Sequence, residues 1–201
     1  MEKKHETMAH GSPARRRRSY VGQLFGFRAG ERKYEIPSTL CGIDVSSEPF
    51  STIFPPGEII RLAEPSEYEN GLMFSDGTCA VYVDDKIVIS VDSKGSSERI
   101  SGGGPLAPGI APYLESRGFG LDIEDSELVE ESPHEVRVWE DFAAAHFTCA
   151  ESAGMDYTGM NVSIDLRGNA DRDYSDDLKK IIEPYTEERI ARMGTGVCDN
   201  P

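Results

Sequence analysis

The sequence predicts an α+β fold: an antiparallel sheet with two hairpins, short helices and a kinked C-terminal helix packed on it, and two disulfides. Three observations predict it. Apolar runs at 79–91 and 136–149 are each divided by a short acidic turn, which is typical of hairpins. Apolar and polar residues alternate over 161–167, as in a half-buried strand. Residues 175–193 carry an apolar face at helical spacing, so a terminal helix is expected to cover the sheet.

The first half of the predicted domain contains a helix, a strand and the first hairpin. The helix is expected at 46–54. Ser46 can cap its start, Pro49 suits its first turn, and Pro55 ends it. A candidate strand at 58–63 and a polar loop then lead into the hairpin.

A glycine run near 101–109 separates the two halves of the predicted domain. It contains no Lys and does not match a phosphate-binding loop, so it is interpreted as a linker. A short helix is expected at 111–117, with Gly118 as its stop. Pro184 is expected to kink the C-terminal helix or to divide it in two.

The composition indicates one globular domain. The chain has 201 residues, a formal net charge of −15 and 38% hydrophobic residues. No stretch approaches the roughly 18 apolar residues of a membrane-spanning helix. The sequence also shows neither a Gly-X-Y period nor a sustained heptad, which argues against a collagen and a coiled coil.

The charge is divided unevenly along the chain. Residues 1–33, predicted to be a disordered basic tail, carry nine basic and three acidic residues. The predicted α+β domain at 34–201 carries 12 basic and 33 acidic residues. The four arginines at 15–18 have three interpretations: a solvated leader, a nucleic-acid-binding arm, or a contact with an anionic membrane. The acidic body would repel a polyanion, so we expect no nucleic acid to bind it.

Residues 15–27 also resemble the charged start of an export signal. In such signals an apolar segment of roughly 7–15 residues follows, and here Arg28, Glu31 and Arg32 interrupt it. We therefore expect no standard signal peptide or membrane anchor in this stretch, so export would need an atypical or incomplete N-terminus.

The cysteines predict disulfides and argue against a metal or redox site. The four are widely spaced, without a C-x-x-C pair: Cys41, Cys79, Cys149 and Cys198. Of the three possible pairings, Cys41–Cys79 with Cys149–Cys198 is favoured, because it places one disulfide in each half. The alternative is four buried, reduced thiols in a cytosolic protein. Paired cysteines imply an oxidising compartment, and so an extracytoplasmic or secreted protein.

Five short segments carry a resemblance to a known type of domain. They are YEIPSTLCG at 34–42, FPPG at 54–57, CAVYVD at 79–84, VW at 138–139 and FTC at 147–149, followed by a last cysteine near the C-terminus. Together they resemble small extracytoplasmic domains of actinobacterial lipoproteins and membrane-anchored proteins. The resemblance spans 34–198 and implies a cell-envelope compartment and a disulfide framework, with no reaction attached.

No catalytic residue, metal ligand or cofactor is predicted. His134-Glu135 starts like a zinc-protease helix motif, but position 138 holds Val where the motif needs His. His146 is expected to be a strand histidine with a satisfied hydrogen bond. No G-x-S-x-G segment offers a nucleophilic serine.

Acidic residues crowd the segment 122–127. The candidates for binding a divalent cation or a basic protein surface are Asp122, Glu124, Asp125 and Glu127. Asp122, Glu124 and Asp125 are also the candidate carboxylates of a hydrolase, a hypothesis that predicts a concave pocket and a carboxyl group with a raised pKa. The alternative is a solvated acidic loop.

These observations favour a non-catalytic, extracytoplasmic acidic binding or interaction module of the cell envelope, with cationic partners. Two alternatives stay open. One is a carboxylate-based hydrolase. The other is a cytosolic protein with a basic nucleic-acid-binding arm, which predicts salt-dependent DNA binding that deletion of 1–33 abolishes.

Overall fold

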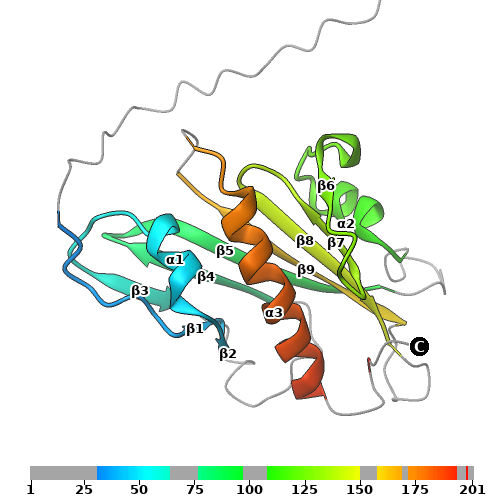
Figure 1. Ribbon diagram of the computed structural model, residues 1–201, viewed down its shortest axis with the longest axis horizontal. Helices are drawn as coiled ribbons and strands as arrows, with labels where there is room; N and C mark the ends of the chain where they lie inside the picture. Colours follow the sequence, from blue (N-terminus) through cyan, green and yellow to red (C-terminus); the bar gives the residue numbers. More distant parts are fainter. Residues whose placement is uncertain are drawn as a thin grey trace, which may run out of the picture.

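The computed structural model describes residues 31–63, 77–96, 108–149, 158–168, 172–193 and 198. The strands are β1 (Thr39–Leu40), β2 (Ile43–Asp44), β3 (Ile60–Ala63), β4 (Gly77–Val83), β5 (Lys86–Ser96), β6 (Glu127–Leu128), β7 (Glu135–Val138), β8 (Phe142–Thr148) and β9 (Gly159–Leu166). The helices are α1 (Ser47–Ile53), α2 (Ile110–Arg117), the 3-10 turn η2 (Ile123–Asp125) and α3 (Ser175–Met193). Seven strands form one antiparallel sheet in the order β3-β4-β5-β9-β8-β7-β6, and helices lie on both faces (Figure 1). The predicted α+β fold is confirmed.

The hairpin of β4 and β5 forms where the sequence predicts it and runs further at both ends. Its two turn residues, Asp84 and Asp85, have φ angles of 48° and 63°. Such left-handed two-residue turns match the right-handed twist of the paired strands. The Asp84 carboxylate also accepts the backbone N–H groups of Glu58 and Ile59, at 3.0 and 2.9 Å, which positions the start of β3.

One face of the sheet, here called the inner face, carries the main hydrophobic core. Alternate strand residues such as Val81, Val91 and Val162 are fully buried on it. They pack beneath Ile53 of α1 and Ile182 of α3. The apolar residues of the alternating strand patterns therefore face α1 and α3.

Helix α3 crosses the inner face as one continuous helix with the predicted bounds. Pro184 lies inside it at an exposed position, and the helix continues through it undivided. The backbone N–H of Ser175 donates to the Asp173 carboxylate at 2.8 Å, which satisfies a donor at the helix start. On the buried side, the fully buried Arg189 donates to the Ser93 hydroxyl of β5 at 3.1 Å.

Two disulfides join the pairs that the sequence favours, and all four sulfurs lie in the inner-face core. Cys41–Cys79 links the β1–β2 turn to β4, and Cys149–Cys198 links the end of β8 to the chain beyond α3. The partners are 38 and 49 residues apart in sequence. In the chain-entropy model, each loop closure of this length stabilises the fold by on the order of 4 kcal/mol.

On the opposite, outer face, α2 packs over β8. Ile110 and Leu114 of α2 pack there on Phe142 and Ala144. Gly118 ends α2 in the left-handed region with φ of 68°, as the sequence predicts. Tyr113 of α2 reaches further across this face, because its hydroxyl contacts Asp92 of β5 and Ser163 of β9.

Three predicted segments lie largely outside the described residues: 1–30 of the basic tail, 64–76 of the polar loop and 101–107 of the glycine run. Arg32 and Lys33, also assigned to the tail, are described. The Lys33 N–H donates to the Gly57 carbonyl at 2.8 Å, and its ammonium pairs with Glu58 at 2.6 Å. None of the described helices is long and apolar enough to span a membrane.

Candidate functional site

The outer face carries a polar stripe along the two central strands. In β9, Ser163 and Asp165 point outward because their neighbours Val162, Ile164 and Leu166 fill the inner core. A second set from β5 lies beside them in the antiparallel register: Asp92 is paired with Ser163, and Ser90 with Asp165. The two aspartates are therefore diagonal neighbours on adjacent strands, within side-chain reach of the same hydroxyls.

A groove opens over this stripe, at the edge of α2. It consists of two adjoining cavities of about 200 and 320 Å³, which share Arg117, Phe119, Asp165 and Arg167. We call it the outer groove and define it by six of its lining residues: Thr78, Ser90, Asp92, Arg117, Asp165 and Arg167. All six of these side chains are charged or carry a hydroxyl group.

Asp92 is the fixed carboxylate of the groove. Its side chain is 8% exposed, and it forms an ion pair with Arg117. It also accepts hydrogen bonds from the Tyr113 hydroxyl of α2 and the Thr78 hydroxyl of β4, both at 2.8 Å. The Tyr113 proton is used on Asp92, so Ser163 must donate in the 2.7 Å contact between their hydroxyls. Three side chains from two elements, α2 and β4, thereby hold Asp92 in place.

Asp165 is the titratable carboxylate of the groove. Its side chain is 15% exposed and is paired with Arg167. Burial raises the pKa of Asp165 from 3.8 to about 6; Arg167 opposes this rise and the nearby Asp141 carboxylate adds to it. Burial outweighs the ion pair, so the charged form of Asp165 destabilises the fold near neutral pH. Such a carboxylate in a cavity is typical of functional sites.

The rim of the groove is formed by the end of α2. Arg117 is in its last turn, and Gly118 reverses the chain so that the Phe119 ring returns to the sheet. That ring lies 5.9 Å from the Tyr113 ring and 4.8 Å from the Phe142 ring, measured between centroids. The groove therefore has an aromatic wall beside its charged floor.

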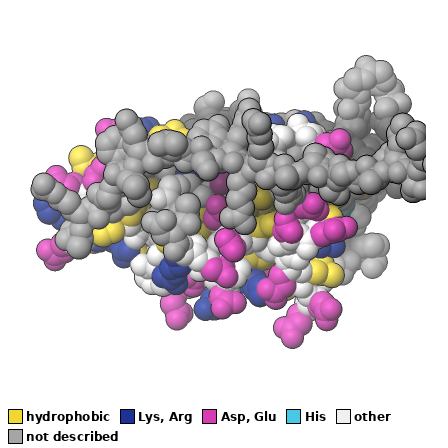
Figure 2. Space-filling model, turned by 90° about the horizontal axis from the view of Figure 1, so that it is seen from above, with side chains coloured by type: hydrophobic (Ala, Val, Ile, Leu, Met, Phe, Trp, Pro, Cys, Tyr) yellow, Lys and Arg dark blue, Asp and Glu magenta, His cyan; other side chains and the backbone are white. Residues whose placement is uncertain are grey.

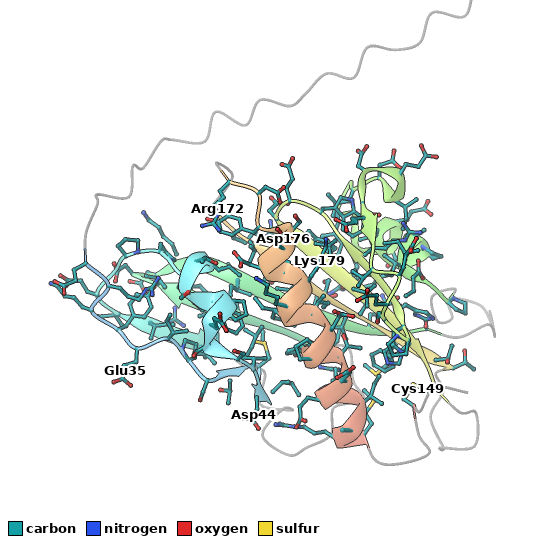
Figure 3. All side chains as sticks on the ribbon, in the orientation of Figure 1. Glu35, Asp44, Cys149, Arg172, Asp176 and Lys179 are labelled. Carbon is teal, nitrogen blue, oxygen red and sulfur yellow. A yellow bond between two sulfur atoms is a disulfide. The ribbon has the colours of Figure 1, made fainter. Side chains whose placement is uncertain are left out.

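The acidic residues predicted to bind a cation or a partner lie elsewhere. Asp122 accepts the backbone N–H of Glu124 at 3.2 Å, which caps η2 beside Asp125. Glu127 pairs at 2.6 Å with Lys179, which Figure 3 shows near the start of α3. Figure 2 shows further acidic side chains interspersed with Lys and Arg. In the described part of the chain, no group of three or more His, Cys, Asp or Glu side chains could hold a metal ion.

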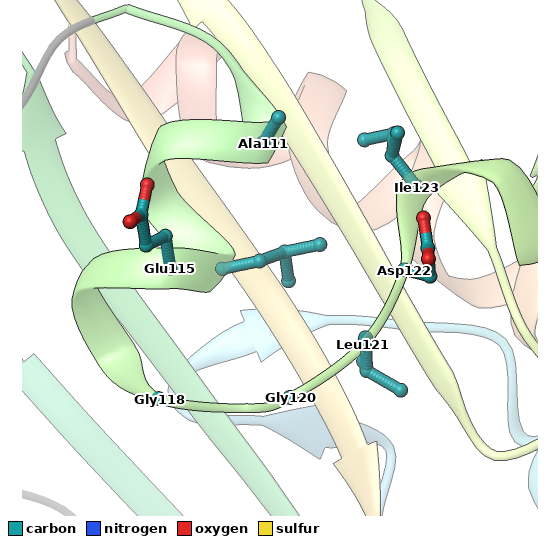
Figure 4. Close-up of a pocket in the computed structure, with 8 residues that line it drawn as sticks. Ala111, Glu115, Gly118, Gly120, Leu121, Asp122 and Ile123 are labelled. Carbon is teal, nitrogen blue, oxygen red and sulfur yellow. The ribbon is translucent and has the colours of Figure 1, made fainter. Parts of the chain in front are cut away.

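A larger pocket of about 530 Å³ lies between α2 and η2 (Figure 4). Asp122 lines it, together with Glu115 and the apolar side chains of Leu114, Leu121 and Ile123. No buried ionisable group lines this pocket, so it offers less chemistry than the outer groove in spite of its volume.

His146 behaves as the sequence predicts. It is 8% exposed, and its Nδ1 lies 3.1 Å from the Asn161 side-chain oxygen. Burial lowers the pKa of His146, so the ring is neutral near pH 7. The sequence did not single out the outer groove, although its signal was present in the alternate residues of 161–167, which are polar and include one carboxylate.

Comparisons with known proteins identify no relative: no protein-family model, no curated protein and no solved structure matches the chain.

Proposed function

We propose that the protein is an extracytoplasmic, disulfide-stabilised binding module of the cell envelope without catalytic activity, and that its ligand binds in the outer groove. The observation that carries the proposal is Asp165. Its carboxyl group is mostly buried yet lines an open cavity, and its charged form is disfavoured there. A bound ligand that donates hydrogen bonds to this carboxylate would replace the lost hydration.

The compartment part of the proposal is supported by the disulfides. Four cysteines in two pairs are compatible with an oxidising compartment, and no free cysteine is found among the described residues. The resemblance to actinobacterial envelope domains agrees with this compartment. An intact-mass count of alkylated thiols on protein from its own cells tests it: zero free thiols are expected, and four would overturn the extracytoplasmic assignment.

The binding part is tested with a groove that is blocked without removing any charge. Ser90 is half-buried at the floor of the outer groove, so Ser90→Tyr would fill the cavity. Thr148 is exposed at the far end of β8 and supplies a matched control, Thr148→Tyr. The Tm of each protein is measured with neutral saccharides, organic acids, polyamines and amino acids.

At least one of these four classes is expected to raise the Tm of the wild type and of Thr148→Tyr but not that of Ser90→Tyr. If no class does so, or if Ser90→Tyr responds like the wild type, the groove is not a binding site and the proposal fails.

A carboxylate-based hydrolase is the second candidate, and one observation favours it. Asp165, with a pKa of about 6, can carry a proton near neutral pH, and the Asp141 carboxylate lines the same groove. The acid would then be Asp165, outside the 122–127 segment that the sequence offered. Turnover of aryl glycosides or aryl esters that is present in the wild type and lost in Asp165→Asn would replace the binding module by this enzyme.

A further inference from the structure

We infer that the ligand class of the outer groove is a neutral, hydroxyl-rich ring, that is, a sugar. This inference rests on the proposed function, because it names what the groove binds. It follows from three properties of the groove: the carboxylates of Asp92 and Asp165 are paired with arginines, its hydrogen-bonding groups are mixed, and it has one aromatic wall.

The pairing of charges favours an uncharged ligand. Asp92 is paired with Arg117, and Asp165 with Arg167, so both carboxylates already have a guanidinium partner. An anionic ligand would have to compete with a carboxylate for an arginine, and it would also meet Asp141. A cationic ligand would have to displace an arginine from the rim. A neutral ligand can contact the Asp165 carboxylate and the exposed parts of the Arg117 and Arg167 guanidinium groups without breaking either pair.

The mixture of donors and acceptors favours hydroxyl groups. The groove offers carboxylate oxygens that only accept, guanidinium groups that only donate, and the Ser90 hydroxyl, which does both. A sugar carries hydroxyls on neighbouring carbons, and each of them can donate to a carboxylate and accept from a guanidinium at once. Charge-assisted hydrogen bonds of this kind are the stronger ones.

The aromatic wall favours a ring with an apolar side. Phe119 is half-buried, and its contacts with Tyr113 and Phe142 fix its plane. A sugar ring presents C–H groups on one side and hydroxyls around its edge, so it can pack on Phe119 while its edge reaches Asp165. The cavity of about 320 Å³ is at the small end of the range for ligand pockets and the adjoining one of about 200 Å³ is below it, which suits one or two such rings.

The test is a calorimetric titration of the full chain, with both disulfides intact, against glucose, galactose, mannose, arabinose and N-acetylglucosamine. Citrate, spermidine and glycine serve as the anionic, cationic and zwitterionic probes. At least one sugar is expected to bind, and saturation-transfer NMR should place its C–H groups against an aromatic ring. Phe119→Leu should weaken binding about tenfold, and Asp165→Asn by a similar factor.

The controls separate the two proposals. Thr148→Tyr should bind the sugar like the wild type, and Ser90→Tyr should not bind it. If citrate, spermidine or glycine binds in a way that Ser90→Tyr abolishes while no sugar binds, the inference about sugars is wrong and the proposed binding function stands. If no probe binds at all, both are wrong. Sugar binding that is unaffected by Phe119→Leu and by Ser90→Tyr would also overturn the inference, because the sugar would then bind elsewhere.

Discussion

The inner and outer faces of the same sheet are built from alternate residues of the same strands, yet they serve different purposes. Along β9, Val162 and Ile164 enter a continuous core, while Ser163 and Asp165 line a polar groove one residue away. The inner face also holds both disulfides. The comparison indicates that stability is concentrated on one face, which allows the other to keep a carboxylate that disfavours folding at neutral pH.

The largest effect is expected from the inner-face disulfides. Replacing Cys149 and Cys198 by Ala should lower the free energy of unfolding by about 4 kcal/mol, because the open chain regains the entropy of a long loop. Urea unfolding measures this change. Replacing Cys41 and Cys79 instead should cost nearly as much, since the loop is only slightly shorter. A loss below about 1 kcal/mol for either pair would contradict this account.

Neighbouring positions on β9 test the two faces directly. Ile164→Ala should lower the free energy of unfolding by about 3 kcal/mol, because it opens a cavity in a fully buried core. Ser163→Ala, on the outer face, should cost only about 1 kcal/mol, the value of one hydrogen bond. Equal losses in urea unfolding would show that the faces do not differ in this way.

Asp165→Asn should stabilise the protein at pH 8 by on the order of 2 kcal/mol, because the charged form of Asp165 is disfavoured in the folded state. The pKa is higher folded than unfolded, so the wild type binds the proton more tightly when folded. Its stability should therefore fall as pH rises from about 4 to about 7, and the gain from Asn should vanish below pH 4. Urea unfolding from pH 4 to pH 8 measures both effects.

Asp85→Asn is the matched control for the removal of a carboxylate, because the Asp85 side chain is 95% exposed in a turn. Its stability at pH 8 should stay within about 0.5 kcal/mol of the wild type. A loss of stability in Asp165→Asn at pH 8 would show that the Arg167 ion pair outweighs burial.

The smallest effect is expected from Tyr113→Phe, which removes the hydroxyl between Asp92 and Ser163. The loss should be about 1 to 1.5 kcal/mol, because Asp92 keeps Thr78 and Arg117 as partners. Tyr82→Phe, at a half-buried position on the outer face of β4, should stay within about 0.5 kcal/mol of the wild type. Thermal unfolding distinguishes the two, and equal values would argue against a fixed Asp92.

Most of the fold could be predicted from the sequence, because local signals agreed with one another. Ser46 caps α1, and Gly118 ends α2 in the conformation that glycine favours. The apolar residues at helical spacing over 175–193 predicted both ends of the long helix α3. The two-residue strands β1, β2 and β6 could not be predicted, since such short strands have no periodicity of their own and depend on their partners.

The candidate site was harder to predict, because its residues come from separate elements. Asp92 and Asp165 are 73 positions apart, and only the β5–β9 register brings them together. Acidic density pointed to 122–127, where the side chains cap η2 or pair with α3. Burial sets the pKa of a carboxyl group, and the number of acidic residues in a segment does not predict which of them is buried.

The disulfides also determine how the molecule would respond to a pulling force applied at its two ends. Tension would pass through the bonds Cys41–Cys79 and Cys149–Cys198, so the chain between each pair would carry none of it. Strand β9 and helix α3 both lie within the second loop and α1 within the first. Only the chain from 79 to 149 and the ends could lengthen, which protects half of the wall of the outer groove from extension.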